Sequence, residues 1–244
     1  MTRRRLLRLL ALIAATLVVM AALAALAFFW VRAQRSRAEL VIRGRIITFD
    51  SAMPEARALA ARGGRIIAIG VNDDVAEHVG WWTREIELED GVVATRGFIE
   101  GPGDFLALAD GQPPLAALES QGRLTTADRA ASARGITSFR DTSATLDDVE
   151  QMKRMIDAGA LKTRLWVAPR LGAVPTASAV ERAAIRGYGD HRLSVRVDGG
   201  DAGPDLELVG SLAPGKLADV TVVRGTTVVY TIVGGEVVYE ADAP

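Results

Sequence analysis

Short β-branched runs divided by glycine pairs stand at both ends of the chain and limit what it can fold into. A Gly-Gly pair accepts the positive φ angles of a two-residue hairpin turn. Hairpins are therefore expected around Gly63-Gly64, between Arg57–Arg62 and Arg65–Ile69, and around Gly234-Gly235, between Thr227–Val233 and Glu236–Tyr239. The pattern predicts that both ends of the chain contribute strands to sheet structure.

Two further turns are expected in the N-terminal half. Gly44-Arg45 divides the run Val41–Phe49 and predicts two strands, and Asp90-Gly91 predicts a hairpin between Arg84–Leu88 and Val92–Thr95. Trp81-Trp82 is expected in the core on one face of this sheet, with an exposed patch at a membrane or partner surface as the alternative.

The middle of the chain alternates helical and strand patterns. Thr125 or Thr126 is expected to cap a helix that runs to about Ala133, and Leu146–Ala158 carries apolar residues at helical spacing. Strands are expected at Ile136–Arg140 and Thr163–Ala168. The order predicts an α/β segment between the two β-rich ends.

Residues Leu9–Val31 form an apolar run of 23 residues in which Thr16 is the only polar side chain. As a helix rising about 1.5 Å per residue, this run is long enough for the roughly 30 Å hydrocarbon core of a bilayer. Arginines flank the run on both sides, with a slight excess before it. We expect a membrane anchor with its N-terminus in the cytoplasm and the bulk of the chain on the extracytoplasmic side.

A cleaved signal peptide is the alternative interpretation of the same segment. Ala22-Leu23-Ala24 or Ala25-Leu26-Ala27 would serve as the small-residue cleavage motif. The apolar run exceeds the roughly 7–15 residues usual for a signal peptide, which favours the anchor. Export of the remaining chain is expected in either case.

Composition excludes several classes of site. The chain has 29 basic and 30 acidic residues, so its net charge of −1 gives no field that favours nucleic acid. The absence of cysteine excludes disulfides, thiolate metal sites and a cysteine nucleophile. No phosphate-binding or dinucleotide fingerprint is present, and no cofactor is predicted.

Four segments resemble the amidohydrolase superfamily of metal-dependent hydrolases. Gly97-Phe98-Ile99-Glu100 is similar to its first barrel strand, and Gly210–Asp219, Gly-Ser-Leu-Ala-Pro-Gly-Lys-Leu-Ala-Asp, is similar to the signature that returns the chain from barrel to sandwich. Within the latter, Pro214-Gly215 suits the centre of a type II turn. Gly135–Ser138 and Leu193–Gly199 resemble the branch similar to N-substituted formamide deformylases.

The resemblance implies an α/β fold in which a composite β-sandwich, built from both termini, joins an incomplete (β/α) barrel. The apolar run adds an N-terminal transmembrane helix to this fold. The implied divisions are 1–37 for the anchor or uncleaved signal, 38–96 and 204–244 for the two parts of the sandwich, and 97–203 for the barrel segment. About 106 residues separate Phe98 from Pro204, whereas a full barrel takes about 250. A half-barrel has open strand edges, which predict self-association or a protein partner.

The family's metal ligands are not in place. The resemblance puts its His-x-His pair at Pro102 and Asp104, and its metal-site lysine at Arg196, where a guanidinium stays protonated and does not ligate. Only His78 and His191 occur in the whole chain, and both are expected in surface or packing roles. The zinc or other divalent metal of the family is therefore not expected, and no catalytic residue is assigned.

Three carboxylates are the remaining candidates for a metal. Glu100, Asp104 and Asp141 follow or end expected strands, at the edge where barrels place their chemistry. Oxygen ligands of this kind suit Mg²⁺ or Ca²⁺.

The leading hypothesis is a degenerate relative of enzymes that hydrolyse amide or formamide carbon–nitrogen bonds, itself without catalysis. The alternatives are an active hydrolase that uses carboxylate ligands or a complementing chain, and a membrane-tethered interaction module. A deletion product without a selected function is the fourth alternative.

Overall fold

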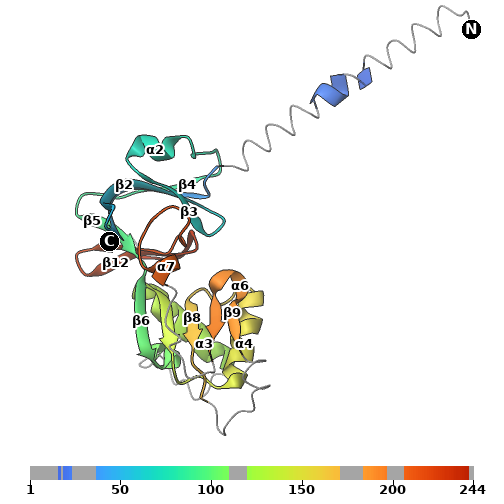
Figure 1. The fold of residues 1–244 in the computed structure, drawn as a ribbon, viewed down its shortest axis with the longest axis vertical. Helices are drawn as coiled ribbons and strands as arrows, with labels where there is room; N and C mark the ends of the chain where they lie inside the picture. The colour runs from blue at the N-terminus through green and yellow to red at the C-terminus, as the bar shows by residue number, and fades with distance from the viewer. Residues whose placement is uncertain are drawn as a thin grey trace, which may run out of the picture.

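The structure is a computed structural model that describes residues 16–17, 19–23, 37–109, 120–170, 184–196 and 206–241. Within these ranges the chain forms two mixed sheets, one drawn from both ends of the sequence and one from its middle (Figure 1). The predicted α/β class is confirmed.

The first sheet has eight strands. In the order β13-β12-β11-β5-β1-β2-β3, with β4 also paired to β1, they are β13 (Glu236–Glu240), β12 (Thr227–Val233), β11 (Val220–Arg224), β5 (Val92–Arg96), β1 (Leu40–Asp50), β2 (Met53–Arg62), β3 (Arg65–Gly70) and β4 (Arg84–Glu87). Antiparallel pairing of β11 with β5 joins the C-terminal strands to the N-terminal ones. The expected hairpins at Gly63-Gly64 and Gly234-Gly235 are confirmed, with φ of 54° to 76° at all four glycines.

This sheet curls until its β3 edge meets the segment that leads into β11. Ile66 N donates to Lys216 O (2.9 Å), and Gly215 N donates to Ile66 O (2.8 Å). The expected Pro214-Gly215 turn makes this contact, with φ of 86° at Gly215. The curl encloses a core of mainly aliphatic side chains, and α2 (Asn72–Ala76) covers the outer face of β2 and β3, with Val75 buried in this contact.

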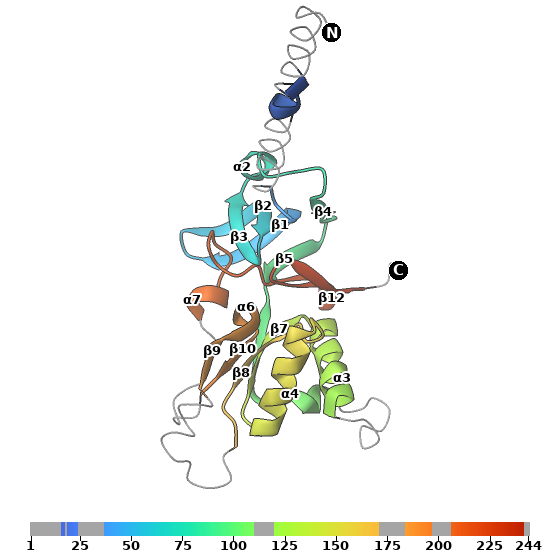
Figure 2. The same ribbon diagram turned by 90° about the vertical axis from the view of Figure 1, so that its right-hand side faces the viewer.

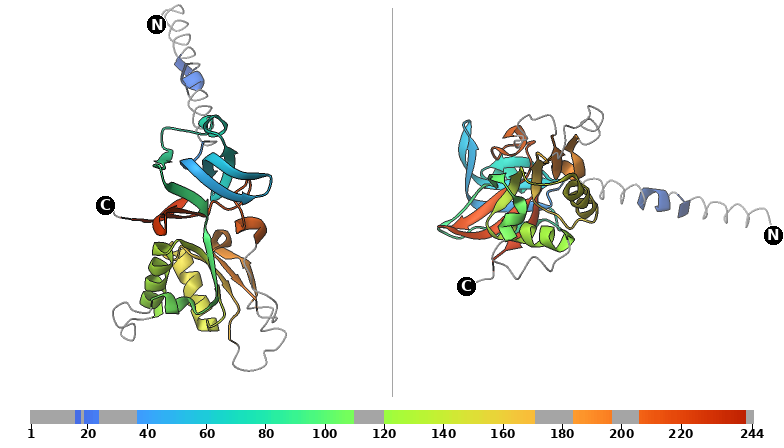
Figure 3. Two further views of the ribbon diagram at one scale, coloured as in Figure 1. Left: turned by 90° about the vertical axis from the view of Figure 1, so that its left-hand side faces the viewer. Right: turned by 90° about the horizontal axis from the view of Figure 1, so that it is seen from below.

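The second sheet has the order β6-β7-β8-β10-β9. Its strands are β6 (Phe98–Gly103), β7 (Ile136–Asp141), β8 (Arg164–Val167), β10 (Leu193–Val195) and β9 (Ile185–Gly187), of which only β9 runs antiparallel to its neighbour. Figure 2 shows α3 (Ser120–Ala133) and α4 (Leu146–Asp157) on one face of this sheet, and Figure 3 shows them side by side. Their buried side chains form one core with β7, β8, β10 and the short helix η1 (Phe105–Ala109).

The sequence of α4 explains why it forms where it does. Thr145 caps it, since its hydroxyl accepts from Asp148 N (3.2 Å) while the Asp148 carboxylate accepts from Thr145 N (2.9 Å). Val149, Met152 and Met155 are buried against the sheet, as their helical spacing predicted. The expected strands on either side of α4 are confirmed as β7 and β8.

In the N-terminal half, the predicted turn at Gly44 and the predicted strand pairing around Asp90-Gly91 are wrong, although Asp90-Gly91 does form a turn in which Val92 N donates to Glu89 O (3.1 Å). β1 is continuous through Gly44, where a register shift in its pairing with β2 marks a bulge. The φ of 133° at Gly44 and the closeness of Leu88, whose Cβ lies 2.5 Å from where a Cβ of residue 44 would be, account for the glycine. β4 and β5 do not pair around Asp90-Gly91; both run parallel to β1, β4 beside Leu40–Arg43 and β5 beside Arg45–Ile47.

Two other predictions in this part of the chain are also wrong. The helix α3 already includes Ser120, and the hydroxyls of Thr125 and Thr126 donate to backbone carbonyls four residues earlier, so neither residue is the cap. Trp81 and Trp82 are not in the core, since they are 74% and 37% exposed. Both are held in a tight turn rather than in a strand that faces the sheet.

The expected anchor at Leu9–Val31 lies outside the described residues except for 16–17 and 19–23, which are helical. In the part of the chain that is described, no helix has the length and apolar character needed to span a membrane.

Candidate functional site

The carboxyl end of β6 forms one side of an open pocket of about 410 Å³. Glu100, Pro102 and Asp104 line it, with Leu108 and Phe139 as apolar walls. Two of the three predicted carboxylates therefore share a pocket, and Pro102 lies between them. Gly101 allows the close passage of β6 along β7, because a Cβ there would lie 2.4 Å from the carbonyl oxygen of Arg140.

Asp104 and Asp141 are both engaged in backbone contacts. Asp104 directly precedes η1, and its Oδ1 accepts from Leu106 N (3.0 Å). Asp141 is 1% exposed, and its Oδ1 accepts from Ser143 N (2.7 Å), Ser143 Oγ (2.9 Å) and Ala144 N (3.0 Å). Its Oδ2 accepts from Phe105 N (3.3 Å), so this carboxylate ties the end of β7 to the start of η1.

The residues at this pocket do not fit the zinc site of a metal-dependent hydrolase. Pro102 has no donor atom, and the carboxylate of Asp141 is surrounded by backbone amides. His78 contacts Glu77 (3.7 Å) just after α2, and His191 lines a different cavity. Among the described residues, no three His, Cys, Asp or Glu side chains gather closely enough to hold a metal ion.

Arg196 lies in a second cavity, of about 330 Å³. Its backbone N donates to Val167 O (2.9 Å) just beyond the end of β10. Arg186 and His191 line the same cavity, and Trp166 and neighbouring aliphatic side chains form the apolar part of its wall. Two guanidinium groups make this position unfavourable for a metal cation.

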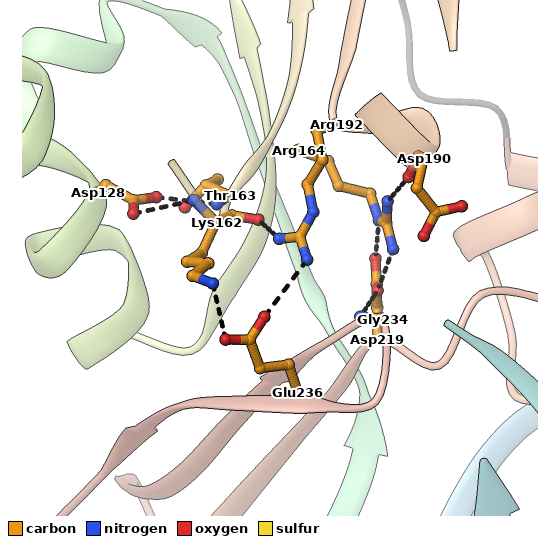
Figure 4. Close-up of polar contacts among 9 residues, drawn as sticks. All are labelled: Asp128, Lys162, Thr163, Arg164, Asp190, Arg192, Asp219, Gly234 and Glu236. Carbon is orange, nitrogen blue, oxygen red and sulfur yellow. Dashed lines mark hydrogen bonds and ion pairs between the residues drawn. The ribbon is translucent and has the colours of Figure 1, made fainter. Parts of the chain in front are cut away.

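A buried ion pair links the second sheet to the first (Figure 4). Arg164 on β8 donates from Nε to Asp219 Oδ2 (2.7 Å) and from Nη2 to Asp219 Oδ1 (3.0 Å), and the two side chains are 0% and 1% exposed. Asp219 also accepts from Gly234 N (2.8 Å) through Oδ1, and its carbonyl accepts from Gly97 N (2.8 Å). One aspartate thus joins β8, the turn between β12 and β13, and the chain between β5 and β6.

A strained turn packs on the same ion pair. Arg164 Nη1 donates to Asp190 O (2.6 Å) in α6 (Tyr188–His191). Asp190 and His191 have φ of 56° and 60°, a left-handed conformation that costs about 1–2 kcal/mol per residue with a side chain. The contact from Arg164 therefore stabilises the backbone that places His191 at the second cavity.

Arg192 and Glu236 extend this network toward the surface (Figure 4). Arg192 donates to the carbonyl of Lys162 and lies 3.8 Å from Glu236, which also accepts from Lys162 Nζ (2.7 Å). Burial lowers the pKa of Arg192 from its ordinary value, and the charge of Arg164 lowers that pKa further. Asp128 on α3 accepts from Lys162 N (3.0 Å) and from the following amide, which fixes the start of β8.

Sequence reasoning did not find the Arg164–Asp219 pair. The available signal was a single arginine in the otherwise uncharged run Thr163–Ala168, together with the aspartate that ends the Gly210–Asp219 signature. A charged residue is rarely buried unless it is paired, so each of these positions pointed to a partner. Nothing in the sequence identified them as partners of one another.

No protein-family model matches the chain, and no curated protein matches it. Solved structures of amidohydrolase superfamily members share structural similarity with it. Molinate hydrolase has 22% identity over 56% of this chain and 31% of that chain (TM-score 0.42), and A. niger ochratoxinase has 17% identity over 59% and 37% (TM-score 0.40). An atrazine chlorohydrolase variant from Arthrobacter aurescens TC1 has 13% identity over 82% and 95% (TM-score 0.42). The chain spans about a third of the length of the first two.

Proposed function

We propose that this chain is a degenerate relative of the metal-dependent amidohydrolases, without hydrolysis of amide or formamide bonds. The observation that carries the proposal is the chemistry of the β6 pocket. At the two positions where the family resemblance expects histidine ligands, Pro102 offers no donor and Asp104 caps η1. Asp141, the nearest buried carboxylate, already accepts four hydrogen bonds.

The cavity beside Arg196 supports the same proposal. The resemblance expects a lysine there that serves the metal, and a neutral or carbamylated lysine is able to do so because its amine gives up a proton. Arginine keeps its charge, and Arg186 adds a second guanidinium to the same cavity. An arginine at position 196 would therefore repel a metal cation, whereas the expected lysine would help to bind it.

The proposal includes a membrane anchor at Leu9–Val31, with the rest of the chain on the extracytoplasmic side. It also takes the curled first sheet as the family's composite sandwich, made from 38–96 and 204–244, and the second sheet as an incomplete barrel within 97–203. The apolar length of the anchor and the Gly210–Asp219 signature support these assignments.

Bound metal is the first test. The full chain, purified in detergent and dialysed against zinc and then manganese, is expected to hold less than a stoichiometric amount of either metal by elemental analysis. It is expected to leave formamide and N-acyl substrates unchanged. Tight metal at one or more per chain that is lost in Asp104→Ala, or metal-dependent turnover, would overturn the proposal.

An active hydrolase is the second candidate function, favoured by the meeting of Glu100 and Asp104 in one pocket. It requires Mg²⁺ or Ca²⁺ on these carboxylates, or ligands from a complementing chain. Turnover that falls in both Glu100→Gln and Asp104→Ala would support it. Turnover that is unchanged in both would exclude the pocket as its site.

An interaction module is the third candidate function. In the described part of the second sheet β6 and β9 are the outer strands, and most residues of β6 are exposed. An open strand edge is a template for pairing with a second copy or a partner segment. Light scattering of the detergent-solubilised chain tests self-association, and a strictly monomeric chain would count against pairing between copies.

A further inference from the structure

A tight turn presents two tryptophans at the surface. Thr83 N donates to Gly80 O (3.1 Å), which places Trp81 and Trp82 at the two corner positions, and Gly80 N donates to Thr83 Oγ1 (2.8 Å). The two rings pack edge to face, with centroids 5.3 Å apart. Trp81 is 74% exposed and Trp82 is 37% exposed, so the turn displays indole surface that the folded domain leaves uncovered.

The same turn is hydrogen-bonded to Ala38, where the chain enters the folded domain. Thr83 Oγ1 donates to Ala38 O (2.7 Å), and Ala38 N donates to His78 O (2.7 Å). Ala38 follows the apolar run Leu9–Val31 by seven residues. Seven residues reach at most about 25 Å, so a bilayer that holds the apolar run lies within that distance of the turn.

The side chains of the turn and of the segment before the domain also suit a membrane surface. Indole rings favour the boundary between hydrocarbon and water, because the ring is apolar and its N–H needs a hydrogen-bond partner. The segment between the apolar run and the domain carries Arg32, Arg35 and Arg37, which suit anionic headgroups. Within the apolar run, Leu17, Met20 and Leu23 are more than half exposed on their helix, so the folded domain does not cover them.

We propose that the Gly80–Thr83 turn is a second membrane contact, with Trp81 and Trp82 in the headgroup region of the bilayer that holds Leu9–Val31. This inference rests on the anchor in the proposed function. Because the anchor already holds the domain at the surface, a contact too weak to bind free protein is sufficient. The second sheet, which lies at the far end of the molecule from α2 and β4, then faces away from the bilayer (Figure 1).

The test uses the position of these indoles relative to brominated lipids, which quench tryptophan fluorescence on contact. The chain has four tryptophans, so the Trp30→Phe, Trp166→Phe double variant leaves Trp81 and Trp82 as the only emitters. The full-length variant is reconstituted into phosphatidylcholine–phosphatidylglycerol vesicles with bromines either shallow or deep in the acyl chains. We expect a loss of emission that is larger with shallow than with deep bromines, because the headgroup boundary is the preferred depth of the ring.

Matched variants separate folding from membrane contact. Trp166 is 7% exposed on β8, so a variant that retains Trp166 and carries Trp30→Phe, Trp81→Ser and Trp82→Ser is expected to keep its emission in brominated vesicles. Its circular dichroism is expected to match that of the parent chain, since the replaced rings project from a turn. Quenching of Trp166 to the same degree as Trp81 and Trp82 would overturn the inference, because it would place both ends of the molecule against lipid.

Alkaline carbonate extraction distinguishes failure of this inference from failure of the anchor. A chain that stays in the vesicle pellet, with Trp81 and Trp82 equally bright in plain and brominated lipid, overturns the turn contact and leaves the anchor in place. A chain released by carbonate overturns both. Retention together with quenching by shallow bromines is the result that we expect.

Discussion

Loss of Asp219 is expected to destabilise the chain more than loss of any surface acid. Asp219→Ala leaves the guanidinium of Arg164 without a counter-ion at a site where the side chain is 0% exposed. Removing one partner of a buried pair costs about 3–5 kcal/mol, because the remaining charge cannot recover its water. The free energy of unfolding of an ordinary domain is about 5–15 kcal/mol, so a large part of this stability depends on the carboxylate of Asp219.

An exposed ion pair of the same length provides the control. Arg224 and Glu89 also meet at 2.7 Å, but their side chains are 47% and 78% exposed. Pairs of this kind contribute about 0–1 kcal/mol, so Glu89→Ala is expected to cost less than about 1 kcal/mol. Urea unfolding in detergent measures both variants, made in the Trp30→Phe, Trp81→Ser, Trp82→Ser background in which the emission comes from Trp166 on β8. An Asp219→Ala chain as stable as Glu89→Ala would refute the reasoning.

A double-mutant cycle shows whether the effect belongs to the pair. In Arg164→Met with Asp219→Ala neither charge of the pair is left buried without the other, so the double variant is expected to be more stable than the sum of the single losses implies, by at least about 1 kcal/mol. It will not return to the stability of the parent chain. Asp190 O and Gly234 N each lose a partner, and an orphaned buried group costs about 1–3 kcal/mol.

Three further changes test smaller parts of the structure. Asp141→Ala is expected to cost about 2–4 kcal/mol in urea unfolding, because it removes the buried acceptor of three backbone amides. Asp104→Ala removes one exposed cap bond and is expected to cost about 0.5–2 kcal/mol. Gly135→Ala is expected to lower the free energy of unfolding more than Gly225→Ala does. Both glycines have positive φ, but only at Gly135 would an added Cβ clash with a side chain, at 2.5 Å from Thr221 Cγ2. Equal losses of stability in the two variants would contradict this. The hydrogen bond to Asp157 raises the pKa of Tyr188 above the value of about 10 that it has in the unfolded chain. This contact therefore stabilises the fold at pH values below about 10, and the stabilisation is lost as the pH rises through the higher pKa of the folded state. Ultraviolet titration of the phenol, with Tyr188→Phe as the reference, checks the direction of the shift.

Local patterns predicted the elements that local chemistry determines. The Gly63-Gly64 and Gly234-Gly235 hairpins follow from positive φ at adjacent glycines, and α4 follows from the spacing of its apolar residues. Gly91 does lie in a turn, but the strands on either side of it pair with β1 and not with each other, and Gly44 lies in no turn at all. Gly44 is a glycine because a bulge and Leu88 leave no room for a side chain, and both causes are tertiary.

The candidate site was predictable in its location but not in its chemistry. The sequence placed Glu100, Asp104 and Asp141 near strand ends, where the structure has them. It did not show that Asp141 would accept four hydrogen bonds around η1, because one of those donors, Phe105 N, is 36 residues away. The exposure of Trp81 and Trp82 was likewise set by a turn whose partner, Ala38, lies far back in the chain.

The Arg164–Asp219 pair shows that the joint between the two sheets is independent of the chemistry of the β6 pocket. Asp219 ends the signature that most resembles the amidohydrolases, and its carboxylate is satisfied by an arginine and a backbone amide. These contacts are made within the protein and need no metal. Neither Pro102 nor Arg196 takes part in this joint, so the residues at the two cavities can differ while the joint between the two sheets stays intact. The proposed function is consistent with this separation, since it requires the fold to persist without a bound metal.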